Sequence, residues 1–172
     1  MGLKLHRKDF SLTNSSWSAE NMRLDDYYNG RCEADNLVGE KLRGPWRRTS
    51  SYDRFQMLEI GGVYLSKFIQ SNACEFTRSI KTTGAAFEYV VFYNKEEQRS
   101  VCIFQAGYLP ERPPGIVHRG AISTMIDAAT CLHATHVCGP MMTVNLNINY
   151  RSTVRVCQHQ PSFKYCVYVT KC

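Results

Sequence analysis

Hydrophobic and polar positions divide the middle of the chain into segments of different spacing. Residues 73–80, 87–93 and 99–105 are rich in β-branched and aromatic side chains, which is typical of strands. The polar run 94–98 separates the last two and predicts a hairpin loop. Three prolines within residues 110–114 then stop any strand from continuing.

The clearest helix is predicted over residues 118–137, where apolar side chains recur at helical spacing and Gly139-Pro140 ends the pattern. The apolar positions of this helix are Ile122, Met125, Ile126, Ala129 and Leu132. Residues 142–151 alternate strictly between apolar and polar side chains, which predicts one long strand. Two shorter strands are predicted at 154–157 and 163–170.

The first third of the chain is polar and irregular. Residues 14–30 predict a helix that Asn14 or the serines after it would cap. Residues 36–53 contain glycine and proline and indicate a linker or a surface wrap. We therefore divide the chain into an extension, residues 1–72, and a domain, residues 73–172, in which antiparallel strands surround one buried helix in an α+β layout.

The composition is that of a folded chain, because 44% of the 172 residues are hydrophobic and 12% are aromatic. No apolar run reaches the length of about 20 residues that a membrane-spanning helix needs, and the first residues form no targeting segment. The net charge of +6 suits a phosphorylated partner, but equally a solubilising surface. Arginines around Trp46 would suit nucleic acid, yet a solvated loop is the commoner explanation, and we expect no nucleic acid partner.

The eight cysteines form no C-x-x-C pair, and several lie in apolar runs. Free cysteine in such runs behaves as a small hydrophobic residue, so the pattern favours a reducing compartment. His133 and His136 are three residues apart on the predicted helix and close enough to share an ion. Because the order C-x-H-x-x-H-x-C around them matches no zinc pattern, we expect no metal.

Asp127 is the only formally charged residue between Gly120 and Arg151. It lies within the predicted core helix, although aspartate favours helix ends and a buried carboxylate is costly unless it is paired. This position indicates a chemical use, such as activating water or attacking a carbonyl. The alternative is an aspartate that bonds a serine or threonine of a strand, or that emerges at the edge of the helix.

His118 and Gly120 precede and open the same helix. A helix N-terminus presents free backbone N–H groups that can stabilise an oxyanion, whereas the alternative is an ordinary loop-to-helix turn. His118 and Asp127 would lie about 13 Å apart along the axis, at about 1.5 Å per residue. If both act on one substrate, the site is expected to be shared between two subunits.

Asn145, Asn147 and Asn149 lie on one face of the predicted long strand, and Arg151 continues that face. Amides and a guanidinium suit the polar pantetheine and phosphate parts of a cofactor. The alternative is a solvated sheet face, although asparagine is depleted in strands.

The motifs at residues 113–127 and 143–150 together resemble the family of thioesterase superfamily members 4 and 5. The resemblance extends back through residues 87–94 and, more weakly, to 8–10 and 14–17. It implies a hotdog fold, in which an antiparallel sheet wraps around a central helix. It also implies a homodimeric hydrolase that cleaves medium- and long-chain fatty acyl-CoA, of the palmitoyl-CoA hydrolase type, with CoA as part of the substrate and no other cofactor.

The resemblance also implies roles for individual residues. Asp127 matches the general base or nucleophile, and His118 and Gly120 match the positions that hold the thioester carbonyl. Asn149 and Arg151 match positions that contact substrate. The family implies a mitochondrial or cytoplasmic location, a part in fatty acid metabolism and a protein kinase as a partner.

Two departures from the family pattern affect these expectations. Arg119 stands where the family has glycine, so its side chain would either obstruct the thioester or add a phosphate contact. The chain ends soon after Tyr150, so we expect the C-terminal strands of the fold to be partly missing and a sheet edge to be exposed. Both departures favour the runner-up function, a non-catalytic protein that binds acyl-CoA or acts in regulation.

Overall fold

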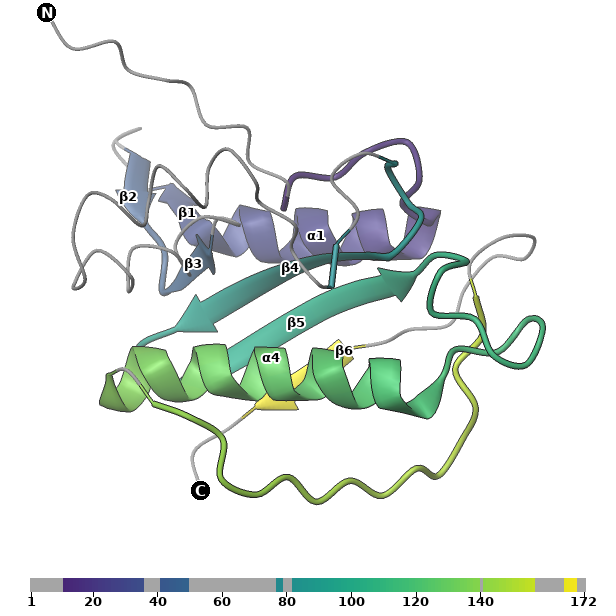
Figure 1. Cartoon of the computed structure of the whole chain (residues 1–172). Coiled ribbons are helices and arrows are strands. Elements are labelled where there is room, and N and C mark those ends of the chain that lie inside the picture. Colours follow the sequence, from purple (N-terminus) through teal and green to yellow (C-terminus); the bar gives the residue numbers. More distant parts are fainter. Residues whose placement is uncertain are drawn as a thin grey trace, which may run out of the picture.

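The computed structural model describes residues 11–35, 41–49, 77–78, 82–139, 141–156 and 166–169. Its helices and strands, in chain order, are α1 (Ala19–Cys32), β1 (Glu33–Asp35), β2 (Lys41–Arg43), β3 (Trp46–Thr49), β4 (Phe87–Asn94), β5 (Arg99–Ala106), α4 (Arg119–Cys138) and β6 (Cys166–Val169) (Figure 1). The α+β class expected from the sequence is confirmed.

The main sheet has four antiparallel strands in the order β3-β4-β5-β6, and β1 pairs separately with β2. β4 and β5 form the predicted hairpin, with Val91 opposite Cys102 in the register. Asn94 stabilises the turn, because its Oδ1 accepts from the backbone N–H of Glu96 at 3.0 Å and of Glu97 at 3.1 Å. The two strands and the loop predicted here are confirmed.

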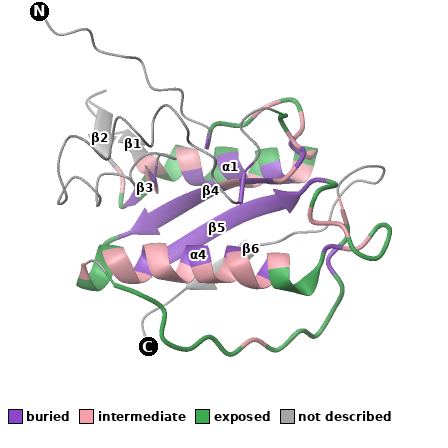
Figure 2. Cartoon of the chain, viewed as in Figure 1, coloured by how far each residue is buried: buried purple, intermediate pink, exposed green. Residues whose placement is uncertain are grey.

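Helices cover both faces of the central hairpin, α1 on one side and α4 on the other (Figures 1 and 2). On the α1 face, Val90 and Phe92 pack with residues of the N-terminal part of the chain. On the α4 face, Val91 packs with Met125 and Ala129. Burial on both faces explains why β4 is almost continuously apolar and lacks the alternation of a half-exposed strand.

The predicted helix over residues 118–137 is confirmed as α4, which His118 caps. Its apolar positions face the sheet, and Met125 is 1% exposed. The helix ends at Gly139, whose φ of 88° is a conformation that glycine adopts without strain. The Gly139 N–H donates to the carbonyl of Thr135 at 2.9 Å, which satisfies a carbonyl at the helix end.

The long strand predicted over residues 142–151 is wrong. In the described part of the chain these residues are extended but join no ladder, and they return along the outer side of α4 (Figures 1 and 2). Val144 is 98% exposed. β3 pairs with the second half of β4 and β6 with the first half of β5, and among the described residues the segment pairs with neither side of the hairpin.

The C-terminal strand predictions have mixed outcomes. The strand predicted over 154–157 is wrong for the described residues, since Arg155 makes only an isolated bridge with Ile116. The strand predicted over 163–170 is confirmed at Cys166–Val169, which pairs with β5.

The N-terminal predictions are partly corrected. α1 begins at Ala19, and its first turn is capped by Ser18, whose Oγ accepts from the Asn21 N–H at 3.2 Å. Asn14 does not cap this helix. The linker predicted over residues 36–53 is wrong where β3 pairs with β4. The strand predicted over residues 73–80 lies mostly outside the described residues.

Among the described residues, no helix combines the length and the apolar character that crossing a membrane would require.

Candidate active site

The N-terminus of α4 is organised by the side chain of His118. Its Nδ1 accepts from the backbone N–H of Gly120 at 3.1 Å, and its carbonyl accepts from the N–H of Ile122 at 3.2 Å. An imidazole that accepts through Nδ1 carries its proton on Nε2 when it is neutral. His118 therefore holds the helix end and keeps a second nitrogen as a hydrogen-bond donor.

Gly120 leaves little room for a side chain beside His118. A Cβ added at residue 120 would lie 3.0 Å from both Cε1 and Nδ1 of His118. The φ of Gly120 is not in the left-handed region, so the constraint is the closeness of the ring and not backbone strain.

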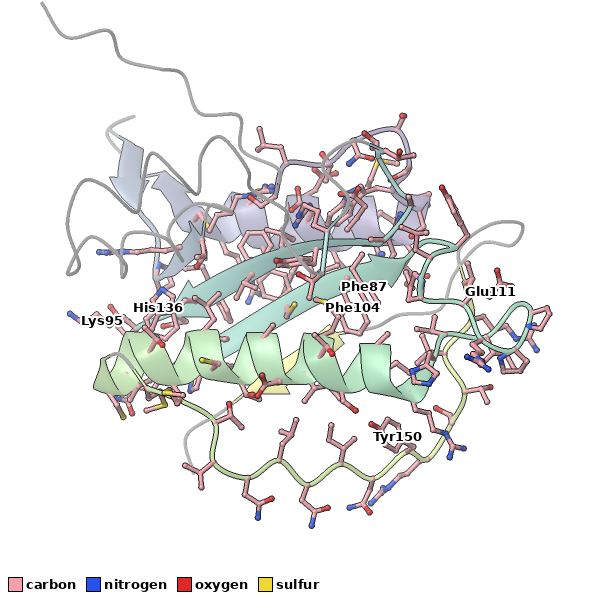
Figure 3. The ribbon with its side chains drawn as sticks, viewed as in Figure 1. Phe87, Lys95, Phe104, Glu111, His136 and Tyr150 are labelled. Carbon is pink, nitrogen blue, oxygen red and sulfur yellow. The ribbon has the colours of Figure 1, made fainter. Side chains whose placement is uncertain are left out.

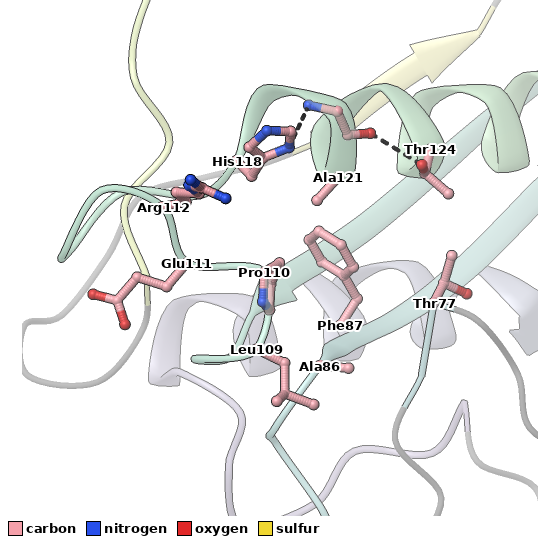
Figure 4. Close-up of a pocket in the computed structure, with 11 residues that line it drawn as sticks. Thr77, Ala86, Phe87, Leu109, Pro110, Glu111, Arg112, His118, Ala121 and Thr124 are labelled. Atoms are coloured by element: carbon pink, nitrogen blue, oxygen red, sulfur yellow. Dashed lines mark hydrogen bonds between the residues drawn. The ribbon is translucent and has the colours of Figure 1, made fainter.

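A pocket of about 650 Å³ opens beside this helix end (Figure 4). Its lining residues are Thr77, Ala86, Phe87, Leu109, Pro110, Glu111, Arg112, His118, Gly120, Ala121 and Thr124. In Figure 4 the ring of Phe87 lies beneath Ala121, and Glu111 and Arg112 lie toward the loop. An apolar interior with a few polar groups at one end is the usual form of a small-molecule site.

Backbone hydrogen bonds hold the loop that carries the polar end of the pocket. The N–H of His118 donates to the carbonyl of Pro110 at 2.7 Å, and the N–H of Arg112 donates to the carbonyl of Ile116 at 2.7 Å. The loop is thereby closed on itself, and the His118 ring is presented from a fixed backbone.

Asp127 lies farther along α4 and is half-buried. Its Oδ1 accepts from the hydroxyl of Thr143 at 2.6 Å. The alternative interpretation of Asp127, a carboxylate bonded by a threonine, therefore holds, except that Thr143 lies in an extended segment and not in a strand. The hydrogen bond occupies one oxygen and leaves a chemical role open to the other.

The sequence-predicted residues fall into two groups. His118 and Gly120 line the pocket, whereas Asp127 does not. Asp127 is not among the residues on the wall of the pocket that holds His118.

The segment 141–151 runs past Asp127 toward the start of α4, and its asparagines are exposed. Asn149 and Arg151 are also exposed and do not line the pocket. The hydroxyl of Tyr150 donates to the carbonyl of Arg119 at 3.2 Å. Sequence reasoning missed Thr143 and Tyr150, because it placed both in a sheet and not against a helix.

His133 and His136 have separate partners. Nδ1 of buried His133 lies 2.8 Å from the hydroxyl oxygen of Ser100, and Nδ1 of His136 lies 2.7 Å from the carbonyl oxygen of Leu132. Burial, together with the nearby His136, lowers the pKa of His133 below its ordinary value. In the part of the chain that the structure describes, no group of three or more histidine, cysteine or acidic side chains is placed to hold a metal ion.

Residues 114–159 match the model of the thioesterase superfamily, and they include the His118 turn, α4 and the segment that follows it. The resemblance indicated by the sequence motifs is therefore confirmed, and this part of the chain is similar to the domains of that superfamily.

The chain is also similar to individual proteins of known name. The chain is 39% identical over 147 residues to acyl-coenzyme A thioesterase THEM4 of Xenopus laevis, covering 86% of this chain and 61% of that protein. It is 37% identical over 159 residues to THEM4 of Mus musculus, covering 88% and 64%. It is 28% identical over 153 residues to acyl-coenzyme A thioesterase THEM5 of Homo sapiens, covering 89% and 60%. The chain thus spans less than two thirds of the length of these relatives.

Proposed function

We propose that this chain hydrolyses medium- and long-chain fatty acyl-CoA to a free fatty acid and CoA. The observation that carries the proposal is the pocket at the start of α4, with His118 and Gly120 on its wall. The half-buried carboxylate of Asp127 on the same helix supplies a base. The names of the relatives, acyl-coenzyme A thioesterases, support the same reaction.

The proposed chemistry follows from these groups. The carboxylate of Asp127 takes a proton from water, and the water oxygen attacks the thioester carbon. The Nε2–H of His118 donates to the carbonyl oxygen as negative charge develops there. The carbon–sulfur bond then breaks, and the proton passes to the departing CoA sulfur. Asn149 and Arg151 contact the CoA part of the substrate.

Asp127 does not line the pocket that holds His118, so one chain does not supply both groups to one thioester. We therefore propose a homodimer in which Asp127 of one copy acts beside the pocket of the other. The exposed apolar side chains of the segment after α4 support an association of this kind, since Met142 is 88% exposed.

Release of free CoA thiol from palmitoyl-CoA by the purified chain tests the proposal. Asp127→Asn should lower kcat by about 10² to 10⁴, the usual contribution of a general base. Asp26→Asn, an exposed aspartate on α1, is the matched control and should leave kcat unchanged. Turnover that persists in Asp127→Asn would refute the role of the carboxylate.

One observation favours the runner-up, a non-catalytic acyl-CoA-binding or regulatory protein. The Gly120 N–H, the expected oxyanion donor, is already bonded to His118. Calorimetric binding of a non-hydrolysable acyl-CoA analogue, measured beside turnover, separates the two functions. Binding without turnover in the wild-type chain would select the runner-up.

The family resemblance also supports a part in fatty acid metabolism in mitochondria or cytoplasm, with a protein kinase as a partner. Fractionation of cells that express the tagged full chain would test the compartment. Co-purification of a kinase that is lost on competition with untagged chain would test the partner.

A further inference from the structure

We infer that Arg119 is a positioning residue that acts through Tyr150 on the substrate contacts of Asn149 and Arg151. Arg119, Ser123 and Tyr150 together form a contact between α4 and the segment after it, which we name the Tyr150 latch. The inference rests on the proposed function for its effect on catalysis, but the latch itself is a structural feature that can be tested separately.

The latch consists of hydrogen bonds around one backbone carbonyl and one cation–π contact. The hydroxyl of Tyr150 donates to the carbonyl oxygen of Arg119 at 3.2 Å. Ser123 Oγ lies 3.1 Å from the same oxygen and also lies beside the Tyr150 hydroxyl, and its single O–H donates to one of the two at a time. The guanidinium carbon of Arg119 lies 5.6 Å from the centre of the Tyr150 ring, within the range of a cation–π interaction. Figure 3 shows the Tyr150 side chain directed at the first part of α4.

The latch determines which way the neighbouring side chains point. In an extended chain, successive side chains lie on opposite sides of the backbone. Fixing Tyr150 against α4 therefore turns Asn149 and Arg151 away from the helix, and both are exposed. The two residues expected to contact substrate are thus oriented by the residue between them.

Because no described strand pairs with the segment, its position depends on contacts of this kind. At its start, Thr143 bonds Asp127, and the thiol of Cys131 donates to the carbonyl of Met141 at 3.8 Å. Beyond its end, the carbonyl of Val154 accepts from the N–H of Val117 at 2.8 Å. Between these anchors, the latch fixes the part that carries Asn149.

The position of Arg119 also argues against one of the two effects expected of it, obstruction of the thioester. Its side chain is exposed, stacks on Tyr150 and does not line the pocket, so it does not obstruct the site. Where the family has glycine, this chain has a side chain that can hold Tyr150. Arg119 therefore ties a substrate-contacting segment to the same helix end that His118 caps.

The test combines a structural and a kinetic measurement on the full chain. Backbone ¹⁵N order parameters of residues 145–151 report whether the segment is held, with about 0.85 expected for the wild type and lower values for Arg119→Gln. Palmitoyl-CoA kinetics of Arg119→Gln should show KM raised about two- to fivefold, the worth of an exposed cation–π contact, with kcat unchanged.

Further variants separate the latch from a general structural effect. Arg119→Lys keeps a cation over the ring and should restore KM. Tyr150→Phe keeps the ring but loses the hydroxyl, so it should loosen the segment and raise KM about three- to tenfold. Arg23→Gln, an exposed arginine on α1, is the matched control and should change neither measurement.

The outcomes distinguish the latch from the proposed function. Order parameters that do not change in Arg119→Gln or Tyr150→Phe would overturn the latch, whether or not the chain is a thioesterase. A looser segment with unchanged KM would overturn the positioning of substrate contacts. If the wild-type chain releases no CoA, the proposed function fails, and the affinity for CoA replaces KM as the measure of positioning.

Discussion

At the scale of single residues, the two ring nitrogens of His118 have different roles. Its Nδ1 caps α4, and in the proposed mechanism its Nε2–H donates to the substrate. A ring that caps a helix end is fixed in orientation, which favours catalysis because no ordering is needed when the substrate binds. The same contact makes the site sensitive to any group added at Gly120.

Gly120→Ala is predicted to lower activity without lowering stability. The added Cβ, 3.0 Å from the His118 ring, is expected to shift the ring by a few tenths of an ångström from its contact with the Gly120 N–H, and kcat/KM should fall about tenfold. Alanine is a better helix former than glycine by up to about 1 kcal/mol, so the free energy of unfolding should not decrease. Gly30→Ala on α1 is the control, because nothing lies within 4 Å of its added Cβ. Equal kcat/KM for both variants would contradict the role of the ring.

His133 is predicted to make the stability of the chain depend on pH. Burial lowers the pKa of His133 in the folded chain, so the unfolded chain binds the proton more readily. The contribution of His133 is therefore complete above about pH 6.5, the ordinary histidine value, and is lost as the pH falls below it. Tyr93, Ser100 and His136 are neighbours of the imidazole ring of His133. None of these neighbours is an anion that would stabilise the charged form of His133.

Urea unfolding of the wild type and of His133→Asn between pH 8 and pH 5 measures this effect. The wild type should lose more free energy of unfolding over this range than the variant, which keeps a polar partner for Ser100 but has no titrating group. If the free energies of unfolding of the two proteins change in parallel with pH, His133 is not the group that makes stability depend on pH.

At the scale of elements, α4 joins the core to the candidate site. One side of the helix packs on the sheet, and the other contacts the segment 141–151 through Asp127 and Tyr150. The positions of His118 and Asp127 thus depend on how tightly α4 packs against β4 and β5.

Met125→Ala is predicted to reduce the free energy of unfolding by about 2–5 kcal/mol, because it leaves a cavity between α4 and the sheet. Met125 is 1% exposed, whereas Met22 on α1 is 40% exposed. Met22→Ala is therefore the control and should change stability by less than about 1 kcal/mol. Urea denaturation of both variants measures the difference. Similar losses in the free energy of unfolding would mean that Met125 does not pack between α4 and the sheet.

At the scale of the whole molecule, the distribution of the candidate residues favours two copies acting together. The pocket contains His118 and not Asp127, and the segment beside Asp127 leaves large apolar side chains uncovered. In a symmetric dimer the pocket of each copy would lie beside Asp127 of the other copy, which gives two equal sites.

Mixing two inactive variants is predicted to restore activity. In a dimer of His118→Ala with Asp127→Ala, one site lacks both residues and the other has both. Random exchange of subunits makes half of the dimers mixed, so about a quarter of the wild-type activity should return. Sedimentation of the same samples gives the oligomeric state. Dimers that form but regain no activity would contradict a shared site.

Much of the fold and part of the site could be predicted from the sequence. The spacing of apolar residues identified α4 and the β4–β5 hairpin, because the side chains of a helix or a strand repeat at short, regular intervals. Asp127 stood out as an isolated charge, and His118 and Gly120 as the start of a helix. Each of these predictions depends on neighbours within about one turn or one hairpin.

Only the tertiary structure decided what residues 142–151 contact. Residues 142–151 have the alternation of a strand, but alternation specifies only which side chains share a face, whereas a strand also needs a partner for its backbone. Among the described residues the segment joins no ladder and lies along α4. Thr143 therefore meets Asp127, and Tyr150 meets Arg119. These contacts join residues far apart in the sequence, and no local pattern encodes them.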